Sequence, residues 1–208
     1  MYALITDGSI AKTLNGNRGL TIGGIQYPQN IFTVWTESQR NAIGIFEVIQ
    51  NDAKKKNEEY YTNTNQTFTY DADAGTVTAT YGDATAKAHA DTLYTADDES
   101  NGLGTEGEVK DEGLKTKLIR DVKKEANRLL TETDWYVTRK SEKSTAIPSN
   151  ITTWRNGIRS KQAAMETSIT NASDTPALET LYTYVNTADE GDPVVMERPL
   201  GEFPVLGS

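Results

Sequence analysis

The spacing of apolar residues changes at Asp111, and this change most constrains what the chain can fold into. Before Asp111 the apolar residues form short runs with partial alternation, which is typical of strands that bury one face. After it they recur every three or four residues, which is the period of a helix with one apolar face. The sequence therefore predicts an α+β protein, with strands in its first half and helices in its second.

The first segment, residues 1–49, favours a small β-rich unit. Asp7-Gly8 stands between the apolar-rich runs YALIT and SIAKTL. An Asp-Gly pair in this setting predicts a hairpin with a type I′ turn, because both central residues of that turn need a positive φ. A further turn is expected at Gly23-Gly24.

One short helix is predicted inside this unit. Thr36 followed by Gln39 matches a capping box, so we expect a helix near 37–43 with Gly44 in the left-handed position after it. A strand over 45–49 should return to the sheet. The expected core of the unit consists of Phe32, Trp35, Ile43 and Phe46.

Residues 50–81 predict a charged connector followed by a second β-hairpin that turns at 71–75. The turn sequence DADAG resembles the start of a calcium loop, but the third ligand and the distal Glu are missing, which favours a plain turn. Residues 82–110 are acidic and lack sustained periodicity, so they are predicted to form a flexible linker.

Residues 111–170 predict an antiparallel helical hairpin. The apolar face of its first helix comprises Leu114, Leu118, Val122, Ala126, Leu129 and Leu130. The second helix follows Pro148, with Ser149 or Asn150 as its cap, and its apolar face comprises Ile151, Trp154, Ile158, Met165 and Ile169. The exposed side of this hairpin is expected to present Leu118, Val122 and Met165 to a partner.

Residues 171–208 predict a third short helix and an extended tail. Asp174 or Thr175 is placed to cap the helix, with Pro176 in its first turn. The prolines at 193, 199 and 204 should keep the tail extended, and its apolar residues indicate that it packs against some other surface.

Charge is distributed unevenly along the chain. Residues 114–161 carry 12 Lys and Arg against 5 Asp and Glu, whereas the remaining residues carry 9 against 25. The basic block either binds an acidic partner, including nucleic acid, or is the solvated face of helices. The basic residues alternate with Glu and Thr and form no tight cluster, which favours the second interpretation.

The composition disfavours an enzyme. The chain has no cysteine, so thiolate catalysis and Cys-based metal sites are excluded, and His89 is its only histidine. GLTIGG at 19–24 lacks the spacing of a dinucleotide-binding loop, and Asp97, Asp98 and Glu99 favour a solvated loop over a metal site. We expect no cofactor and no metal, and a small hydrolase ranks last among the functions considered.

Two tryptophans stand in an otherwise polar stretch. Trp135 follows the first predicted long helix and Trp154 lies near the start of the second, so both rings should lie at one end of the hairpin. Either they line a ligand pocket or they form a buried clasp between the helices, and the clasp needs no ligand. Asp134 is expected to act as a cap or to pair with Arg155 or Arg159.

The segments RLLTETDW and IPSNITTWRNGIR resemble the phage tail assembly chaperone (tail-fibre assembly) family. The resemblance covers about a quarter of the chain, and its loop is rich in Lys and Ser rather than in Leu and Pro. The matching residues are Arg128, Leu129, Leu130, Thr133, Asp134, Trp135, Pro148, Trp154, Arg155 and Arg159.

The resemblance implies a non-enzymatic phage tail-associated protein that binds another tail or fibre protein, either as a virion component or as an assembly chaperone in the host cytoplasm. The residues expected to form the partner-binding surface or the clasp are Leu118, Val122, Leu130, Asp134, Trp135, Pro148, Trp154, Arg155 and Arg159. Self-association stays open. A polyanion or nucleic-acid binder that uses the basic hairpin is the alternative, although the net charge of −9 disfavours nucleic acid.

No membrane segment is expected, because no run of apolar residues approaches the length of 18 that would span a bilayer. The first residues, MYALITDGSIAK, also lack the basic start and long apolar run of a secretory signal.

Overall fold

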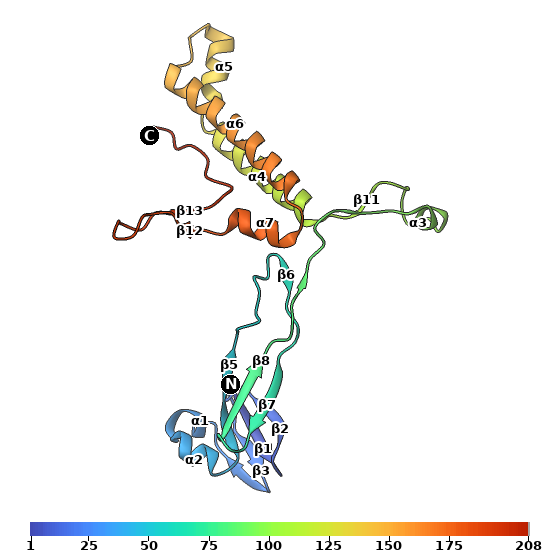
Figure 1. The fold of residues 1–208 in the computed structure, drawn as a ribbon, viewed down its shortest axis with the longest axis vertical. Coiled ribbons are helices and arrows are strands. Elements are labelled where there is room, and N and C mark those ends of the chain that lie inside the picture. The colour runs from blue at the N-terminus through green and yellow to red at the C-terminus, as the bar shows by residue number, and fades with distance from the viewer. Residues whose placement is uncertain (208) are drawn as a thin grey trace. The chain divides into compact units, whose positions relative to one another are not determined.

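The computed structural model describes residues 1–207 and is a mixed α+β protein (Figure 1). Its chain divides into two compact units, Met1–Thr85 and a second that begins at Ala86. Among the described residues, no helix is both long enough and apolar enough to cross a membrane.

The first unit is built on a five-stranded sheet with the order β2-β1-β5-β8-β7. The strands are β1 (Tyr2–Thr6), β2 (Ser9–Leu14), β5 (Ile45–Asn51), β7 (Thr67–Asp71) and β8 (Thr76–Thr80). Strand β1 pairs antiparallel with both β2 and β5, whereas β5 pairs parallel with β8. Four shorter strands are β3 (Leu20–Ile22), β4 (Ile25–Tyr27), β6 (Tyr61–Thr62) and β9 (Thr85–Ala86).

Local turn chemistry explains the hairpins of this unit. Asp7 and Gly8 both have positive φ, at 50° and 72°, as the predicted type I′ turn between β1 and β2 requires. The predicted turn at Gly23-Gly24 joins β3 to β4. In the β7–β8 hairpin, the carboxylate of Asp71 accepts hydrogen bonds from the backbone N–H groups two and three residues later, so DADAG forms the predicted turn.

The predicted short helix is present as α2 (Glu37–Asn41). Thr36 accepts a hydrogen bond from the Gln39 N–H and the Gln39 side chain accepts one from the Thr36 N–H, which completes the capping box. Gly44 has the expected positive φ of 81°. A single helical turn, α1 (Ile31–Val34), precedes α2 and was not expected from the sequence.

The sheet has a separate apolar cluster on each face, and this corrects the predicted core. Ile31, Phe32 and Ile45 are buried in one cluster, with Trp35 and Ile43 packed against it. Phe46 does not belong there, because neighbouring residues of a strand point to opposite faces. It packs instead on the opposite face of the sheet, against a cluster whose buried members are Ala3, Val48, Val77 and Ala79.

The parallel pairing of β5 with β8 joins two segments that the sequence analysis separates at residue 49. Val48 lies opposite Val77 in this pair, and both side chains are buried in one cluster. A hairpin alone in water is marginally stable, whereas a strand added to an existing sheet shares its core. Residues 1–49 and the 71–75 hairpin therefore belong to the same unit.

The second unit begins within the segment that was predicted to be a flexible linker. Residues 92–111, called the arm from here on, contain β10 (Thr92–Leu93), α3 (Ala96–Ser100) and β11 (Val109–Asp111), and β10 pairs antiparallel with β11. Thr95 and Asp98 form a second capping box, at the start of α3. These three elements were not predicted, because the segment is acidic and because short paired strands need no periodic apolar pattern.

Just before the arm, residues 87–91 bind to the helices. The carbonyls of Ala88 and His89 accept hydrogen bonds from the N–H groups of Leu114 and Lys115. The first N–H groups of a helix have no acceptor within the helix, and this segment supplies acceptors for two of them. The linker prediction is therefore wrong for residues 87–91.

Asp91 completes the attachment at the same helix start. Its carboxylate accepts hydrogen bonds from the Gly113 N–H at 2.6 Å and from the Thr116 hydroxyl at 2.7 Å. These bonds, the Gly113 bond first, lower the pKa of the Asp91 carboxyl. A Cβ on Gly113 would lie 2.3 Å from the carbonyl carbon of Ala90, so only glycine allows this approach.

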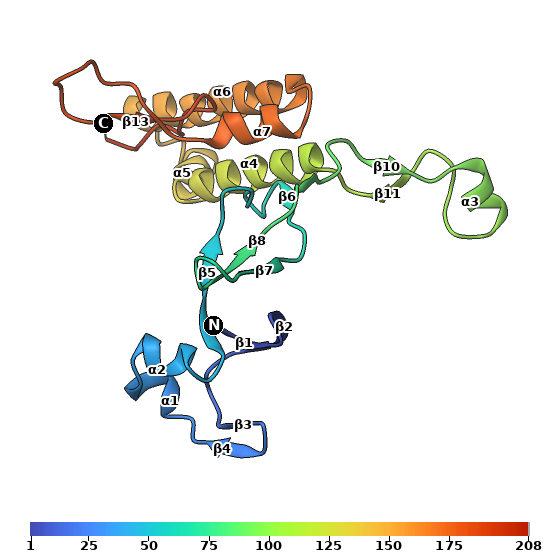
Figure 2. The same ribbon diagram turned by 60° about the horizontal axis from the view of Figure 1, so that its bottom comes forward.

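Four helices follow, named α4 (Leu114–Thr131), α5 (Asp134–Lys143), α6 (Ser149–Asn171) and α7 (Thr175–Tyr182). Helices α4 and α6 lie side by side in both views (Figures 1 and 2). They run antiparallel, because Lys115 at the start of α4 donates to the Thr170 carbonyl near the end of α6, whereas Arg155 near the start of α6 donates to the Leu130 carbonyl at the end of α4.

The caps of these helices differ in part from expectation. Asp174 caps α7 by accepting from the Ala177 N–H at 2.8 Å, as predicted. Helix α6 starts at Ser149 with Pro148 as its N-cap and without a side-chain cap, so the predicted cap is wrong. Much of the predicted loop between the two long helices is itself helical, as α5.

The tail after α7 is not extended throughout. Strands β12 (Val185–Asn186) and β13 (Met196–Glu197) pair antiparallel. Beyond them, Leu200 is buried, and the carbonyl of Pro204 accepts a hydrogen bond from the indole N–H of Trp154. The tail thus covers part of the helices.

We expect limited proteolysis to cut first within residues 96–107 of the arm, because no residue of α3, β10 or β11 is buried. Mass spectrometry of the first products checks this. The bonds from residues 87–91 to α4 should hold both fragments together on size-exclusion chromatography. First cuts within 87–91 would contradict the expected attachment.

Candidate functional site

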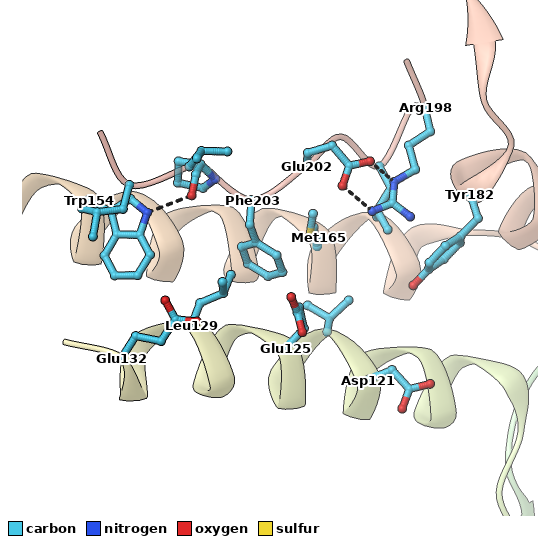
Figure 3. Close-up of a pocket in the computed structure, with 15 residues that line it drawn as sticks. Asp121, Glu125, Leu129, Glu132, Trp154, Met165, Tyr182, Arg198, Glu202 and Phe203 are labelled. Carbon is cyan, nitrogen blue, oxygen red and sulfur yellow. Dashed lines mark hydrogen bonds and ion pairs between the residues drawn. The ribbon is translucent and has the colours of Figure 1, made fainter. Parts of the chain in front are cut away.

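A groove of about 550 Å³ lies between α4, α6 and the tail (Figure 3). We call it the tail groove. Its apolar lining comes from Val122 and Leu129 on α4, Trp154 and Met165 on α6, and the tail residues Leu200, Phe203, Pro204, Val205 and Leu206. The groove therefore depends on three segments that are far apart in the sequence.

The apolar pattern of the helices explains the lining. Ala126, Trp154 and Ile158 form a buried cluster, and Leu129, Leu130 and Phe203 pack against it. Trp154 contributes its ring to the groove and donates from its indole nitrogen to the Pro204 carbonyl at 2.8 Å. A buried indole N–H needs such an acceptor, so this bond holds the tail against α6.

Carboxylates surround the apolar lining. Figure 3 shows Asp121, Glu125 and Glu132 along α4, and Glu202 on the tail beside Arg198. Arg198 pairs with Glu202 at 2.7 Å within the groove. Arg128 does not line the groove but lies 2.7 Å from Glu125 and 3.2 Å from Glu132.

The charge of this rim is negative at neutral pH. The hydrogen bond from Arg128 lowers the pKa of Glu125, so that carboxylate stays ionised. Four carboxylates and one arginine line the groove. The arrangement fits a ligand with an apolar side and positive charge.

A buried arginine fixes the end of the helical pair. The side chain of Arg155 is 9% exposed and donates to the Leu130 carbonyl at 2.8 Å, to the Thr133 hydroxyl at 2.7 Å and to Asp134 at 2.8 Å. The predicted ion pair with Asp134 is thus confirmed. Arg159, the other predicted partner, is exposed and donates to Asn156.

The two tryptophans have different roles, which corrects the expectation that both are buried. Trp154 is 7% exposed, whereas Trp135 is 52% exposed. The α5 helix begins at Asp134 and its first turn directs Trp135 outward. The Trp135 ring stacks on Tyr136 with centroids 3.7 Å apart, and the Arg139 guanidinium lies 4.8 Å and 5.1 Å from the two ring centroids.

The remaining predicted residues are found in three settings. Leu118 is buried between the helices and does not line the tail groove, and Val122 and Met165 are buried at its base. The expectation that they form an exposed face is wrong, because the apolar stripe of each helix is used for packing. Leu130 is half-buried against the Trp154 cluster, and Pro148 is the exposed N-cap of α6.

Sequence reasoning missed the contribution of residues 87–91, and it predicted that the tail packs without identifying the surface on which it packs. The signal for the tail was its apolar content, with Leu200 and Phe203 in a stretch otherwise rich in Pro and Gly. Nothing in the sequence of residues 87–91 indicated from which N–H groups their carbonyls accept hydrogen bonds.

His89 has a structural partner. One ring nitrogen lies 3.0 Å from the Ala172 carbonyl, near the end of α6. Within residues 1–207, no three acidic or histidine side chains are grouped in a way that would hold a metal ion.

The arm should respond to acid in a defined range. Hydrogen bonds from Lys110 and then from the Thr95 N–H lower the pKa of Asp98 from 3.8 to about 2. Because the folded value lies below the ordinary one, this carboxylate stabilises the arm above about pH 4, and the contribution is lost as the pH falls towards about 2.

NMR titration of the Asp98 carboxyl checks this value. The Lys110→Met variant should shift the midpoint back towards its ordinary range, because the largest cause of the shift is removed. A midpoint near 4 in the unaltered protein would contradict the ion pair.

Comparisons of the chain with protein families, with curated proteins and with solved structures find no match.

Proposed function

We propose that the chain is a non-enzymatic, phage tail-associated protein that binds another tail or fibre protein through the tail groove. The observation that carries this proposal is the groove itself, with its apolar lining and carboxylate rim. The docking module is the helical hairpin of α4 and α6 together with the tail segment across it.

The residues that resemble the tail assembly family support the proposal by where they lie. Leu130, Thr133, Asp134 and Arg155 form one hydrogen-bonded junction, and Trp154 packs beside it. Five of the ten matching residues therefore lie together in one folded element. The same junction sets the end of the helices that line the groove.

The chemistry of the groove defines the partner segment. An occupant needs apolar side chains to cover Leu129 and Phe203, and Lys or Arg to meet the carboxylates of Asp121 and Glu132. Complementary charge of this kind speeds association and selects the partner, while buried apolar contacts supply most of the affinity.

Charge reversal tests the role of the groove. In a phage that lacks its own copy of the gene, the variant Asp121→Lys/Glu132→Lys should restore infectious particles at least about tenfold less well than the unaltered protein. The matched control is Asp189→Lys/Glu190→Lys, which makes the same charge change on exposed residues outside the groove.

Negative-stain microscopy of the particles shows whether tails or fibres are missing. Full restoration by the groove variant, with the folded protein present in normal amount, would overturn the proposal. The content of purified particles then separates the two forms of the proposal: a fixed copy number indicates a virion component, and absence indicates an assembly chaperone.

The basic block over 114–161 supports a second candidate, a polyanion binder. We expect no binding of duplex DNA at about 0.15 M salt, because the overall charge of −9 repels it and the cations are dispersed. Fluorescence anisotropy with a labelled duplex over a salt series checks this. A sub-micromolar affinity that falls steeply with salt would favour the second candidate.

A further inference from the structure

The arm has no core of its own. All residues of its strands β10 and β11 are exposed, α3 buries none, and each strand has one unpaired edge because the sheet contains only these two strands. A two-stranded ribbon in water is marginally stable without a surface to pack on. The arm therefore has the properties of a docking element.

One face of the arm makes contacts within the arm, and the other face is exposed. A Cβ on Gly104 would lie 2.5 Å from the Tyr94 ring, and the Lys110 ammonium lies 5.7 Å from the centroid of that ring, so Tyr94 organises the arm from inside. Leu93 and Val109 are cross-strand partners, and each is 47% exposed. They form an apolar pair on the ribbon.

This apolar pair stands in acidic surroundings. The arm contains one basic residue, Lys110, and its acidic residues are Asp97, Asp98, Glu99, Glu106, Glu108 and Asp111. Its surface is therefore complementary to a partner that is both apolar and basic.

Helix α5 presents a surface with these properties. Trp135, Tyr136, Arg139, Lys140 and Lys143 follow the spacing that places residues on one side of a helix, and we call this side the aromatic–basic face. Its two rings and the guanidinium are already stacked together, so they would lose little conformational freedom on binding. Trp, Tyr and Arg are also the residues most enriched at energetic centres of interfaces.

The arm cannot reach this face within its own chain. It joins α4 at the first turn, whereas α5 follows the last turn, and the 18 residues of α4 span about 27 Å. Figures 1 and 2 both show the arm pointing away from the helices at the end opposite to α5.

We infer that the arm of one copy of this chain docks on the aromatic–basic face of α5 of a second copy. Leu93 and Val109 cover the exposed Trp135 ring and the half-buried Tyr136 ring, and the carboxylates of the arm meet Lys140 and Lys143. The contact is head-to-tail, because it joins two different surfaces, so repeated contacts close into a ring or extend into a chain. It uses neither the carboxylate rim nor the lining of the tail groove, so it stands whether or not the groove binds a tail protein.

Sedimentation velocity of the full-length protein tests the inference. Over about 1 µM to about 1 mM the protein should self-associate, and association should weaken as salt rises to about 1 M, where screening acts within about 3 Å. The arm variant Glu106→Lys/Glu108→Lys and the α5 variant Lys140→Glu/Lys143→Glu should each weaken association by at least about tenfold.

Combining the four substitutions in one chain is the decisive measurement. In that protein the reversed charges at positions 106 and 108 of the arm meet the reversed charges at positions 140 and 143 of α5, so association should return. Contacts between two arms or between two α5 helices would gain no such compensation. Lys12→Glu/Arg18→Glu, on exposed residues of the first unit, is the control and should leave association unchanged.

Three results would overturn the inference. The first is a protein that stays monomeric over the whole concentration range. The second is unchanged association in either double variant, and the third is a fourfold variant that stays monomeric although circular dichroism shows it folded.

Discussion

Replacement of Trp154 by alanine should lower the free energy of unfolding of the helical unit by about 3–5 kcal/mol, the range for removing a large buried aromatic side chain. Trp154 is 7% exposed and packs with Ala126 and Ile158. The substitution leaves a cavity in this cluster and also removes the hydrogen bond to the Pro204 carbonyl. The tail should therefore loosen together with the helices.

Trp135→Ala is the matched control for this substitution. It deletes the same side chain from a position that is 52% exposed, so the expected cost is below about 1 kcal/mol. Urea denaturation followed by circular dichroism at the helical wavelength measures both variants. Equal costs, or a Trp154→Ala cost below about 1 kcal/mol, would contradict the different placement of the two rings.

Replacement of Arg155 by methionine should cost about 2–3 kcal/mol, because it removes charge-assisted hydrogen bonds from a buried group and keeps most of the side-chain volume. The Thr133 hydroxyl and the Leu130 carbonyl lose a donor inside the protein. The Asp134 carboxylate is 55% exposed and can return to water, so the ion pair itself contributes little of this cost.

Two further variants separate these contributions. Asp134→Asn should cost below about 1 kcal/mol, because it removes the partly exposed charge and retains an acceptor. Arg159→Met, on the exposed side of the same helix, should change stability by no more than about 0.5 kcal/mol. A cost for Arg159→Met as large as that for Arg155→Met would mean that the buried junction is not what stabilises this end of the helices.

Much of the local structure was predictable from the sequence. The Asp7-Gly8 turn, the capping box of Thr36 and Gln39, and the cap of Asp174 follow from dihedral preferences and hydrogen bonds within about four residues. The apolar spacing also marked the buried face of α4, since Leu114, Leu118, Val122 and Ala126 are all buried.

The candidate site was predictable only in part. The stretch from Leu130 to Arg159 was recognisable as the place where the helices meet, and the Asp134–Arg155 pair was expected there. The tail groove was not, because its lining joins Val122 and Trp154 to Phe203. Contacts over such separations depend on how the tail packs, which no local pattern records.

The outward direction of Trp135 was also not predictable from the sequence. An aromatic residue beside an apolar helix is usually buried, and composition alone favours that outcome. Its exposure follows from the helix that begins at Asp134, because the first turn of α5 leaves the ring outside.

The sequence by itself determined the α+β class, the hairpin turns, the caps of α2 and α7 and the apolar stripes, because each depends on neighbouring residues and on the periods of the backbone. Only the tertiary structure decided that β8 joins β5 in one sheet, that residues 87–91 bind the start of α4, and that the tail lies over Trp154. These three contacts connect residues at least 26 positions apart. Their partners are selected by the shape and the unsatisfied hydrogen-bonding groups that remain once the local elements have formed.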